Sequence, residues 1–335
     1  ALLFSYFIYA EHFGFTHKVP NTFFAIFSLA LFLYAPKKAI LIAGFSIGIL
    51  WFYWIGYSFE YQGVGFMLPI ITFGFGIIYS LFFGVLALTN KVYIRALLLF
   101  GLSFIEPFDW NWLQIELIFK ESYIGIFKYQ LLIVLISLTL IKYVKKGFRV
   151  FPLLLLIFSI NIQTPLQETS TLKIKLVETN INQNEKWLPS NRENIIAMVL
   201  GKIQEAKDEK YDIIIFPESV FPMYLNTKVA LIQTLLKNSN DIAIIAGSLL
   251  RENGNNFNVT YMFHEGTYNI AKKMVLVPFG EYIPLPTFAQ KIINDTFFSG
   301  QSDFIQAKEP TDFIIKGEKF RNAICYEASC QEIYE

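Results

Sequence analysis

A series of long apolar runs fills the first 163 residues and constrains the fold more than any other feature of the sequence. A helix needs about 20 mostly apolar residues to cross the hydrocarbon core of a bilayer. The runs that approach this length cover 22–35, 38–55, 66–89, 92–105, 122–141 and 149–162. The shorter opening segment, 1–10, is expected to be the end of a further span. We therefore predict a polytopic α-helical membrane domain over 1–163, with about seven spans, the first one partial.

The charges between these runs alternate along the chain. Three alternate loops are basic and carry Lys37 and Lys38, then Lys91 and Arg95, then Lys142, Lys145, Lys146 and Arg149. The intervening loops are acidic or mixed, with Glu60 in one, and Glu106, Asp109, Glu116, Lys120 and Glu121 in another. Basic loops are typical of the cytoplasmic side. The pattern places the chain after Gln163 outside the cytoplasm. Buried helices of a large soluble protein, the alternative, give no such alternation.

Two motifs in the apolar half resemble catalytic or substrate-binding motifs. Gly44-Phe45-Ser46-Ile47-Gly48 matches a serine-hydrolase nucleophile elbow, but that elbow requires a strand-to-helix turn. We expect these glycines to allow close helix packing instead. Glu106, beside Pro107 and Trp112, lies at a span end, where an interfacial aromatic anchor is favoured over substrate contact.

The second half has a different composition and periodicity. Residues 164–335 carry 17 Lys/Arg and 21 Asp/Glu, against 11 and 6 in 1–163. Helical spacing occurs in 191–208 and 229–236. Strand patterns occur at 172–179, 211–217, 241–248, 258–263, 267–270 and 320–326. This alternation predicts an α/β layered domain over 170–335.

Several classes of function are disfavoured by composition. A net charge of +1 without a basic stripe predicts no nucleic-acid partner. The two cysteines, Cys325 and Cys330, cannot form a disulfide scaffold. The three histidines show no metal-ligand spacing, so we expect neither a metal nor a cofactor.

Three polar residues stand near the ends of predicted strands. Glu218 follows YDIIIFP, Lys273 precedes MVLVPFGE, and Cys325 ends FRNAIC. Acyl transfer through cysteine needs a thiolate, a base and a positive group for the developing oxyanion, and these three side chains supply them. A helix after Cys325 would lower its thiol pKa. Taken singly, each has a structural explanation: a helix cap, a solvated charge and a small buried hydrophobe.

The sequences around these residues resemble the apolipoprotein N-acyltransferase branch of the nitrilase superfamily. The matching stretches are FPES around Glu218, K-x-x-L-V-P-F-G-E-Y-x-P-L from Lys273 to Leu285, and ICYE around Cys325. Asn180…Gln183…Lys186-Trp187 and Phe257-Asn258 also match this branch. The resemblance implies a four-layer α-β-β-α sandwich for the second domain.

The resemblance also implies roles for residues. Glu218 would be the general base, Lys273 the group that stabilises the tetrahedral intermediate, and Cys325 the nucleophile. Further residues expected to support the site or bind substrate are Glu281, Trp187, Tyr326, Glu327 and Asn258. Cys330 is expected only to pack.

The implied reaction is ping-pong, with a thioester on Cys325. A phospholipid, typically phosphatidylethanolamine, would give its acyl chain to the α-amine of a lipoprotein's diacylglyceryl-cysteine. The expected location is the bacterial inner membrane, with the catalytic domain on the periplasmic side. Family members continue beyond the position of Glu335, so we expect an incomplete nitrilase-like domain. The alternatives are a membrane-tethered amidase and an inactive, truncated membrane protein.

Overall fold

The computed structural model describes residues 1–59, 65–107, 111–161, 169–277, 281–282 and 304–334. The chain forms two compact units, Ala1–Pro165 and Leu166–Glu335. Four parts of the sequence-based predictions lie outside the described residues: Glu60, Asp109, and residues 278–280 and 283–285 of the long motif.

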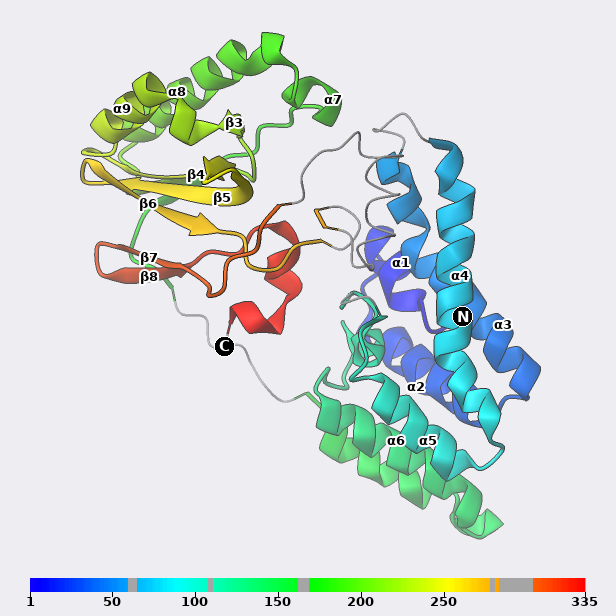
Figure 1. The fold of residues 1–335 in the computed structure, drawn as a ribbon. Coiled ribbons are helices and arrows are strands. Elements are labelled where there is room, and N and C mark those ends of the chain that lie inside the picture. The colour runs from blue at the N-terminus through cyan, green and yellow to red at the C-terminus, as the bar shows by residue number, and fades with distance from the viewer. Residues whose placement is uncertain (60–64, 108–110, 162–168, 278–280, 283–303, 335) are drawn as a thin grey trace. The chain divides into compact units, whose positions relative to one another are not determined.

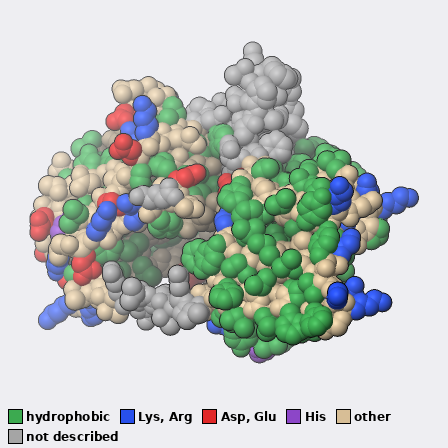
Figure 2. Space-filling model, turned by 90° about the horizontal axis from the view of Figure 1, so that it is seen from below, with side chains coloured by type: hydrophobic (Ala, Val, Ile, Leu, Met, Phe, Trp, Pro, Cys, Tyr) green, Lys and Arg blue, Asp and Glu red, His purple; other side chains and the backbone are tan. Residues whose placement is uncertain are grey.

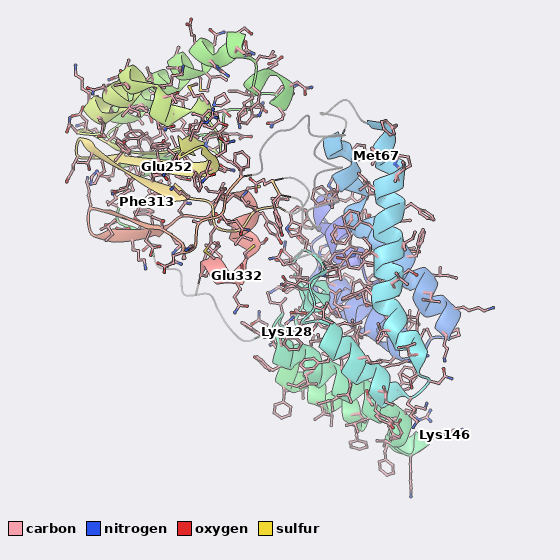
Figure 3. All side chains as sticks on the ribbon, viewed as in Figure 1. Met67, Lys128, Lys146, Glu252, Phe313 and Glu332 are labelled. Atoms are coloured by element: carbon pink, nitrogen blue, oxygen red, sulfur yellow. The ribbon has the colours of Figure 1, made fainter. Side chains whose placement is uncertain are left out.

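The first unit consists mainly of helices (Figure 1). The α-helices are α1 (Tyr6–His12), α2 (Lys18–Tyr34), α3 (Lys37–Phe52), α4 (Leu68–Gly84), α5 (Val92–Leu102) and α6 (Lys128–Tyr143). The longer 3-10 segments are η1 (Tyr53–Phe59), η3 (Val85–Leu88), η5 (Ile115–Phe119) and η7 (Phe151–Ser159). In Figure 3, Lys128 marks the first residue of α6, and Lys146 lies beyond its last residue, in the short 3-10 helix η6 (Lys146–Phe148).

Among the described residues, two helical segments are long and apolar enough to cross a membrane, Lys37–Tyr57 and Gly65–Leu88. Lys18–Tyr34 and Val92–Leu102 are shorter apolar helices. The span predicted over 149–162 contains the nine-residue 3-10 helix η7, which packs on α6. Hydrophobic side chains make up much of the face of this unit that Figure 2 shows. Exposed examples include Leu81, Leu88 and Phe158, the surface expected of a protein surrounded by lipid.

Glycines bring α3 and α4 into close contact, as the sequence predicts. A Cβ on Gly44 would lie 2.6 Å from the carbonyl oxygen of Tyr79, and one on Gly48 would lie 2.3 Å from that of Phe75. Ser46 is a helical residue whose hydroxyl donates to the carbonyl of Ile42 over 2.9 Å. The motif is therefore a helix-packing surface, because its serine lies within a continuous helix.

Arg95 differs from its prediction as a loop residue. It belongs to α5 and is buried, and its guanidinium donates to the carbonyls of Leu33 and Ala35 at the end of α2, and to that of Thr89. Helix ends leave carbonyls without helical partners, and a cation there is favourable.

The second unit is built on a six-stranded mixed sheet. Its strands are β1 (Ile174–Leu176), β2 (Ile213–Ile215), β3 (Phe221–Tyr224), β4 (Ala243–Glu252), β5 (Asn255–His264) and β6 (Thr267–Lys272). The order is β1-β2-β4-β5-β6, with β3 also paired to β4. The pairs among β1, β2 and β4 are parallel, while β5 pairs antiparallel with β4 and β6.

Each face of this sheet carries its own core. Helices α8 (Arg192–Asp208) and α9 (Val229–Asn238) cover one face, where Val199 and Leu235 pack among residues that include Ile214. A two-stranded sheet, β7 (Asp312–Ile315) with β8 (Glu318–Arg321), covers the other face. Because strand side chains alternate, Ile213 faces this second core, where Phe313 lies (Figure 3).

The predicted α/β domain is confirmed, and three of the expected four layers lie within the described residues: helices, large sheet and small sheet. The strand predicted over 320–326 is wrong after Arg321. Strand β8 ends at Arg321, and a 3-10 helix, η10, covers Cys325–Ser329.

Candidate active site

Glu218 lies in the turn that follows β2, at the carboxyl edge of the parallel strands. The next residue, Ser219, has a left-handed φ of 49°. The turn rests directly on β4, because a Cβ on Gly247 would lie 2.7 Å from Glu218 Cα and 2.4 Å from the nitrogen of Ser219. Only glycine at 247 leaves room for Glu218 in this position.

Lys273 follows β6 and is 1% exposed. Its backbone N–H donates to the carbonyl of Asn258 on β5 over 2.9 Å, which continues the pairing of the two strands by one residue. The ammonium Nζ lies 2.9 and 2.8 Å from the two carboxylate oxygens of Glu281, and 3.9 Å from Oε1 of Glu218. A lysine this deeply buried keeps its charge only when carboxylates surround it.

The two carboxylates beside Lys273 have different environments. Both oxygens of Glu281 are occupied, by Lys273, by the Asn258 amide at 3.0 Å and by the N–H of Val277 at 2.9 Å. Glu218 accepts a hydrogen bond from the Asn258 amide on Oε1 at 2.7 Å, and it lines a cavity together with Cys325. Glu281 is therefore held by several donors, whereas Glu218 is the carboxylate that faces the same cavity as the thiol.

Cys325 begins η10 and does not end a strand. Its φ is 54°, which strains a residue other than glycine, and such strain gathers at functional sites. The residue is exposed, and with Glu218 it lines a cavity of about 150 Å³. Ile215, Gly247, Val259 and other residues complete the lining.

The pKa of the Cys325 thiol is raised, contrary to the expectation from the sequence. Although the residue is partly exposed, loss of water around the thiol is the largest cause, and the negative charge of Glu218 adds to it. The ammonium of Lys273 and the N–H of Tyr326 act in the opposite direction but do not prevail. The resting site thus holds a neutral thiol near the side chain of Glu218.

Glu327 joins the segments that carry Cys325 and Lys273. It is 2% exposed, and its carboxylate accepts three backbone hydrogen bonds. Oε1 accepts from the N–H groups of Met274 (2.5 Å) and Val275 (3.0 Å), and Oε2 accepts from that of Ile324 (2.7 Å). These bonds fix the segment that carries Cys325 to the chain that follows Lys273.

The remaining predicted residues lie around this centre. Tyr326 is buried, and Trp187 is 39% exposed at the end of the short helix α7 (Gln183–Lys186). Cys330 is buried, and its thiol donates to the carbonyl of Tyr326. Within the described ranges, no three His, Cys, Asp or Glu side chains are grouped to hold a metal ion.

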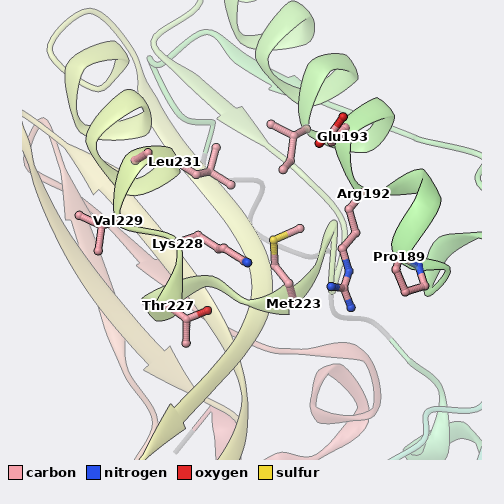
Figure 4. A pocket seen from close by; sticks show the side chains of 10 residues that line it. Pro189, Arg192, Glu193, Met223, Thr227, Lys228, Val229 and Leu231 are labelled. Carbon is pink, nitrogen blue, oxygen red and sulfur yellow. The ribbon is translucent and has the colours of Figure 1, made fainter.

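A larger cavity, about 510 Å³, lies at the beginnings of α8 and α9 (Figure 4). Arg192, Met223 and Lys228 are among its lining residues, while Glu218 and Cys325 are not. The chemistry described above therefore belongs to the smaller cavity.

Two contacts with the turn at Glu218 were not predicted from the sequence. Gly247 makes one, and the available signal was a glycine inside a buried strand, which often marks a close approach of another backbone. Lys186 makes the other. Its ammonium donates to the carbonyl of Glu218 over 2.9 Å, a contact that no local pattern predicts.

A family model and two relatives that are similar to this chain carry the same description. Residues 1–162 match the family model for the apolipoprotein N-acyltransferase integral membrane domain. The apolipoprotein N-acyltransferase of Wolinella succinogenes is 38% identical over 337 residues, covering 100% of this chain and 81% of that protein. The enzyme of the same name from Campylobacter jejuni is 34% identical over 346 residues, covering 100% and 76%.

A solved structure of a CN-hydrolase superfamily protein from Xanthomonas campestris is also similar to this chain. It has 17% identity and a TM-score of 0.35, and the similarity covers 48% of this chain and 55% of that one.

Proposed function

Because the chain belongs to the apolipoprotein N-acyltransferase family, we propose that Cys325 carries the acyl group as a thioester between a lipid donor and a lipoprotein amine. The chain is an acyltransferase of lipoprotein maturation. The observation that carries the thioester is that Cys325 and Glu218 line the same cavity, with Lys273 3.9 Å from the same carboxylate.

The first half-reaction makes the thioester. Glu218 takes the thiol proton as the sulfur of Cys325 attacks the ester carbonyl of the donor. Negative charge develops on the carbonyl oxygen, and Lys273 is the nearby cation that stabilises it. The carbon–oxygen bond then breaks, and the departing lysolipid alkoxide receives the proton from Glu218.

The second half-reaction uses the same groups. A lipoprotein amine attacks the thioester carbonyl, and Glu218 takes a proton from the attacking nitrogen. The carbon–sulfur bond breaks, and the sulfur of Cys325 recovers a proton. The products are an amide and the resting thiol, so no metal or redox group is needed to balance the reaction.

We propose that the first unit holds this chemistry at a lipid surface. We assign residues 1–163 to a transmembrane bundle and 170–335 to the catalytic domain, on the periplasmic side of the bacterial inner membrane. The basic loops and the exposed apolar surface support this assignment. The proposed donor is phosphatidylethanolamine, and the proposed acceptor is the diacylglyceryl-cysteine at a lipoprotein N-terminus.

The test uses the full chain and phospholipid labelled in its 1-acyl chain. We expect a hydroxylamine-sensitive thioester that Cys325→Ser abolishes and Cys330→Ser retains. A diacylated lipopeptide should discharge the thioester with formation of an amide. Thioester in Cys325→Ser but not in Cys330→Ser would refute the assignment, and release of free fatty acid without amide would indicate a hydrolase.

A further inference from the structure

Lys186 is a half-buried cation with a neutral partner. It ends α7, and its ammonium donates to the backbone carbonyl of Glu218 over 2.9 Å. In the part of the chain that the structure describes, no carboxylate forms an ion pair with it. Lys273 differs in this respect, because two carboxylates lie within 4 Å of its ammonium.

The missing counter-ion has an energetic cost. Burial lowers the pKa of Lys186, and the more distant charge of Glu218 only partly opposes this effect. A charged group taken out of water without a partner is unfavourable. An anion that binds at this ammonium would remove this cost. The ammonium donates to one carbonyl, so its other protons are available to donate to such an anion.

The position of Lys186 matches the geometry of a phospholipid ester. The ammonium donates to the backbone carbonyl of Glu218, and the side chain of Glu218 lines the cavity that Cys325 also lines. One residue therefore separates the ammonium from this cavity, a separation on the order of 10 Å. In a glycerophospholipid the phosphodiester lies only a few bonds from the ester that reacts.

The residue after Lys186 adds an exposed aromatic side chain. Trp187 directly follows Lys186 and is 39% exposed. A cation beside an exposed indole is a combination suited to the boundary between a lipid headgroup and its acyl chains.

We propose that Lys186 binds the phosphodiester of the acyl donor and so makes this site selective for anionic-phosphate lipids over neutral esters. The proposal rests on the acyl-transfer function given above and adds the group that recognises the donor. Its competitor is a purely structural role, in which Lys186 holds the turn at Glu218. The two roles differ in outcome, because a displaced Glu218 would slow the reaction of every donor.

The experiment compares two donors that carry the same acyl chain. One is phosphatidylethanolamine, and the other is the neutral 4-nitrophenyl ester, which lacks a phosphate. Thioester formation by the full chain is measured for wild type, Lys186→Met and Lys186→Arg. Lys237→Met, at an exposed lysine of α9, is the control.

For Lys186→Met we expect the KM for phosphatidylethanolamine to rise about tenfold or more, with kcat changed by less than about twofold. The nitrophenyl ester should react at the wild-type rate, which also shows that the variant is folded. Lys186→Arg should restore most of the phospholipid affinity, and Lys237→Met should behave as wild type.

An equal loss with both donors would overturn the proposal in favour of the structural role. Wild-type behaviour of Lys186→Met with both donors would also overturn it. Failure of the wild-type protein to form thioester with either donor is a different result, since it would refute the function itself.

Discussion

The Nδ2 of Asn258 lies 2.7 Å from Oε1 of Glu218, and this contact fixes the carboxylate from the sheet side. The same amide also reaches Glu281, so one strand residue holds both acidic groups in place. Because an amide donates without adding charge, it orients two carboxylates that would otherwise repel each other.

Replacing Asn258 with Asp should remove this donor and add a third carboxylate. We expect kcat for acyl transfer to fall about 100-fold, the scale for losing a hydrogen bond to a charged group in a buried site. Asn255→Asp, at the exposed start of β5, is the control and should retain activity. Near-wild-type kcat in Asn258→Asp would show that Glu218 does not depend on the amide.

Replacing Gly247 with Ala should displace Glu218. The new Cβ would lie 2.4 Å from the nitrogen of Ser219, a distance that the backbone must relieve by moving. We expect kcat to fall at least about tenfold, because small displacements of a catalytic group are costly. Gly201→Ala is the control, since nothing lies within 4 Å of its Cβ. Circular dichroism should show that both variants fold, and full activity in Gly247→Ala would contradict the placement of the turn.

Removing the charge of Glu218 should lower the pKa of Cys325. The carboxylate raises this pKa by its charge and by its hydrogen bond, so Glu218→Gln moves the value downward. Alkylation by iodoacetamide, followed against pH in a Cys330→Ala background, should show a lower midpoint in Glu218→Gln. Thioester formation should fall about 100-fold or more in the same variant, because the base is gone. A midpoint that moves upward would refute this description of the resting site.

Replacing Glu327 with Gln should loosen the segment that carries Cys325. An amide retains one acceptor oxygen and places an NH₂ where the carboxylate accepts backbone donors. We expect a loss of about 1–3 kcal/mol in the free energy of unfolding and a lower thioester yield. Thermal unfolding measures the first effect. Glu332→Gln, an exposed change nearby, is the control, and equal stabilities of the two variants would count against the role of Glu327.

The two ends of the segment around η7 should lie on opposite sides of the membrane. A reporter fused after Lys145 is expected to behave as cytoplasmic, because four basic residues gather there. A reporter fused after Thr169 should behave as periplasmic. Reversed signals would overturn the proposed topology and the access of the site to lipoproteins.

Elements with long, regular patterns could be predicted closely from the sequence. The helix predicted over 191–208 is α8, Arg192–Asp208, and the apolar run at 211–217 contains β2. Strand β3 was missed, because Phe-Pro-Met-Tyr is short and contains a proline, which argues against a strand. The apolar end of FRNAIC suggested a strand to Cys325, but tertiary contacts hold that residue at a positive φ that no local pattern encodes.

The residues of the candidate site could be predicted from the sequence better than their arrangement. Glu218, Lys273 and Cys325 could be selected because polar residues at strand ends gather at one edge of such a sheet. The difference between Glu218 and Glu281 could not be predicted, since it depends on which oxygens Asn258 and Lys273 occupy. The direction of the Cys325 pKa shift likewise depends on burial, which a sequence does not state.

The protonated resting state of Cys325 also bears on how sensitive this residue is to oxidation. Peroxides and disulfides attack cysteine as the thiolate, and oxidation beyond the sulfenic acid is largely irreversible. A thiol whose pKa is raised offers them little thiolate, even though the residue is exposed. We therefore expect the raised pKa to slow the oxidation of Cys325 in the absence of substrate.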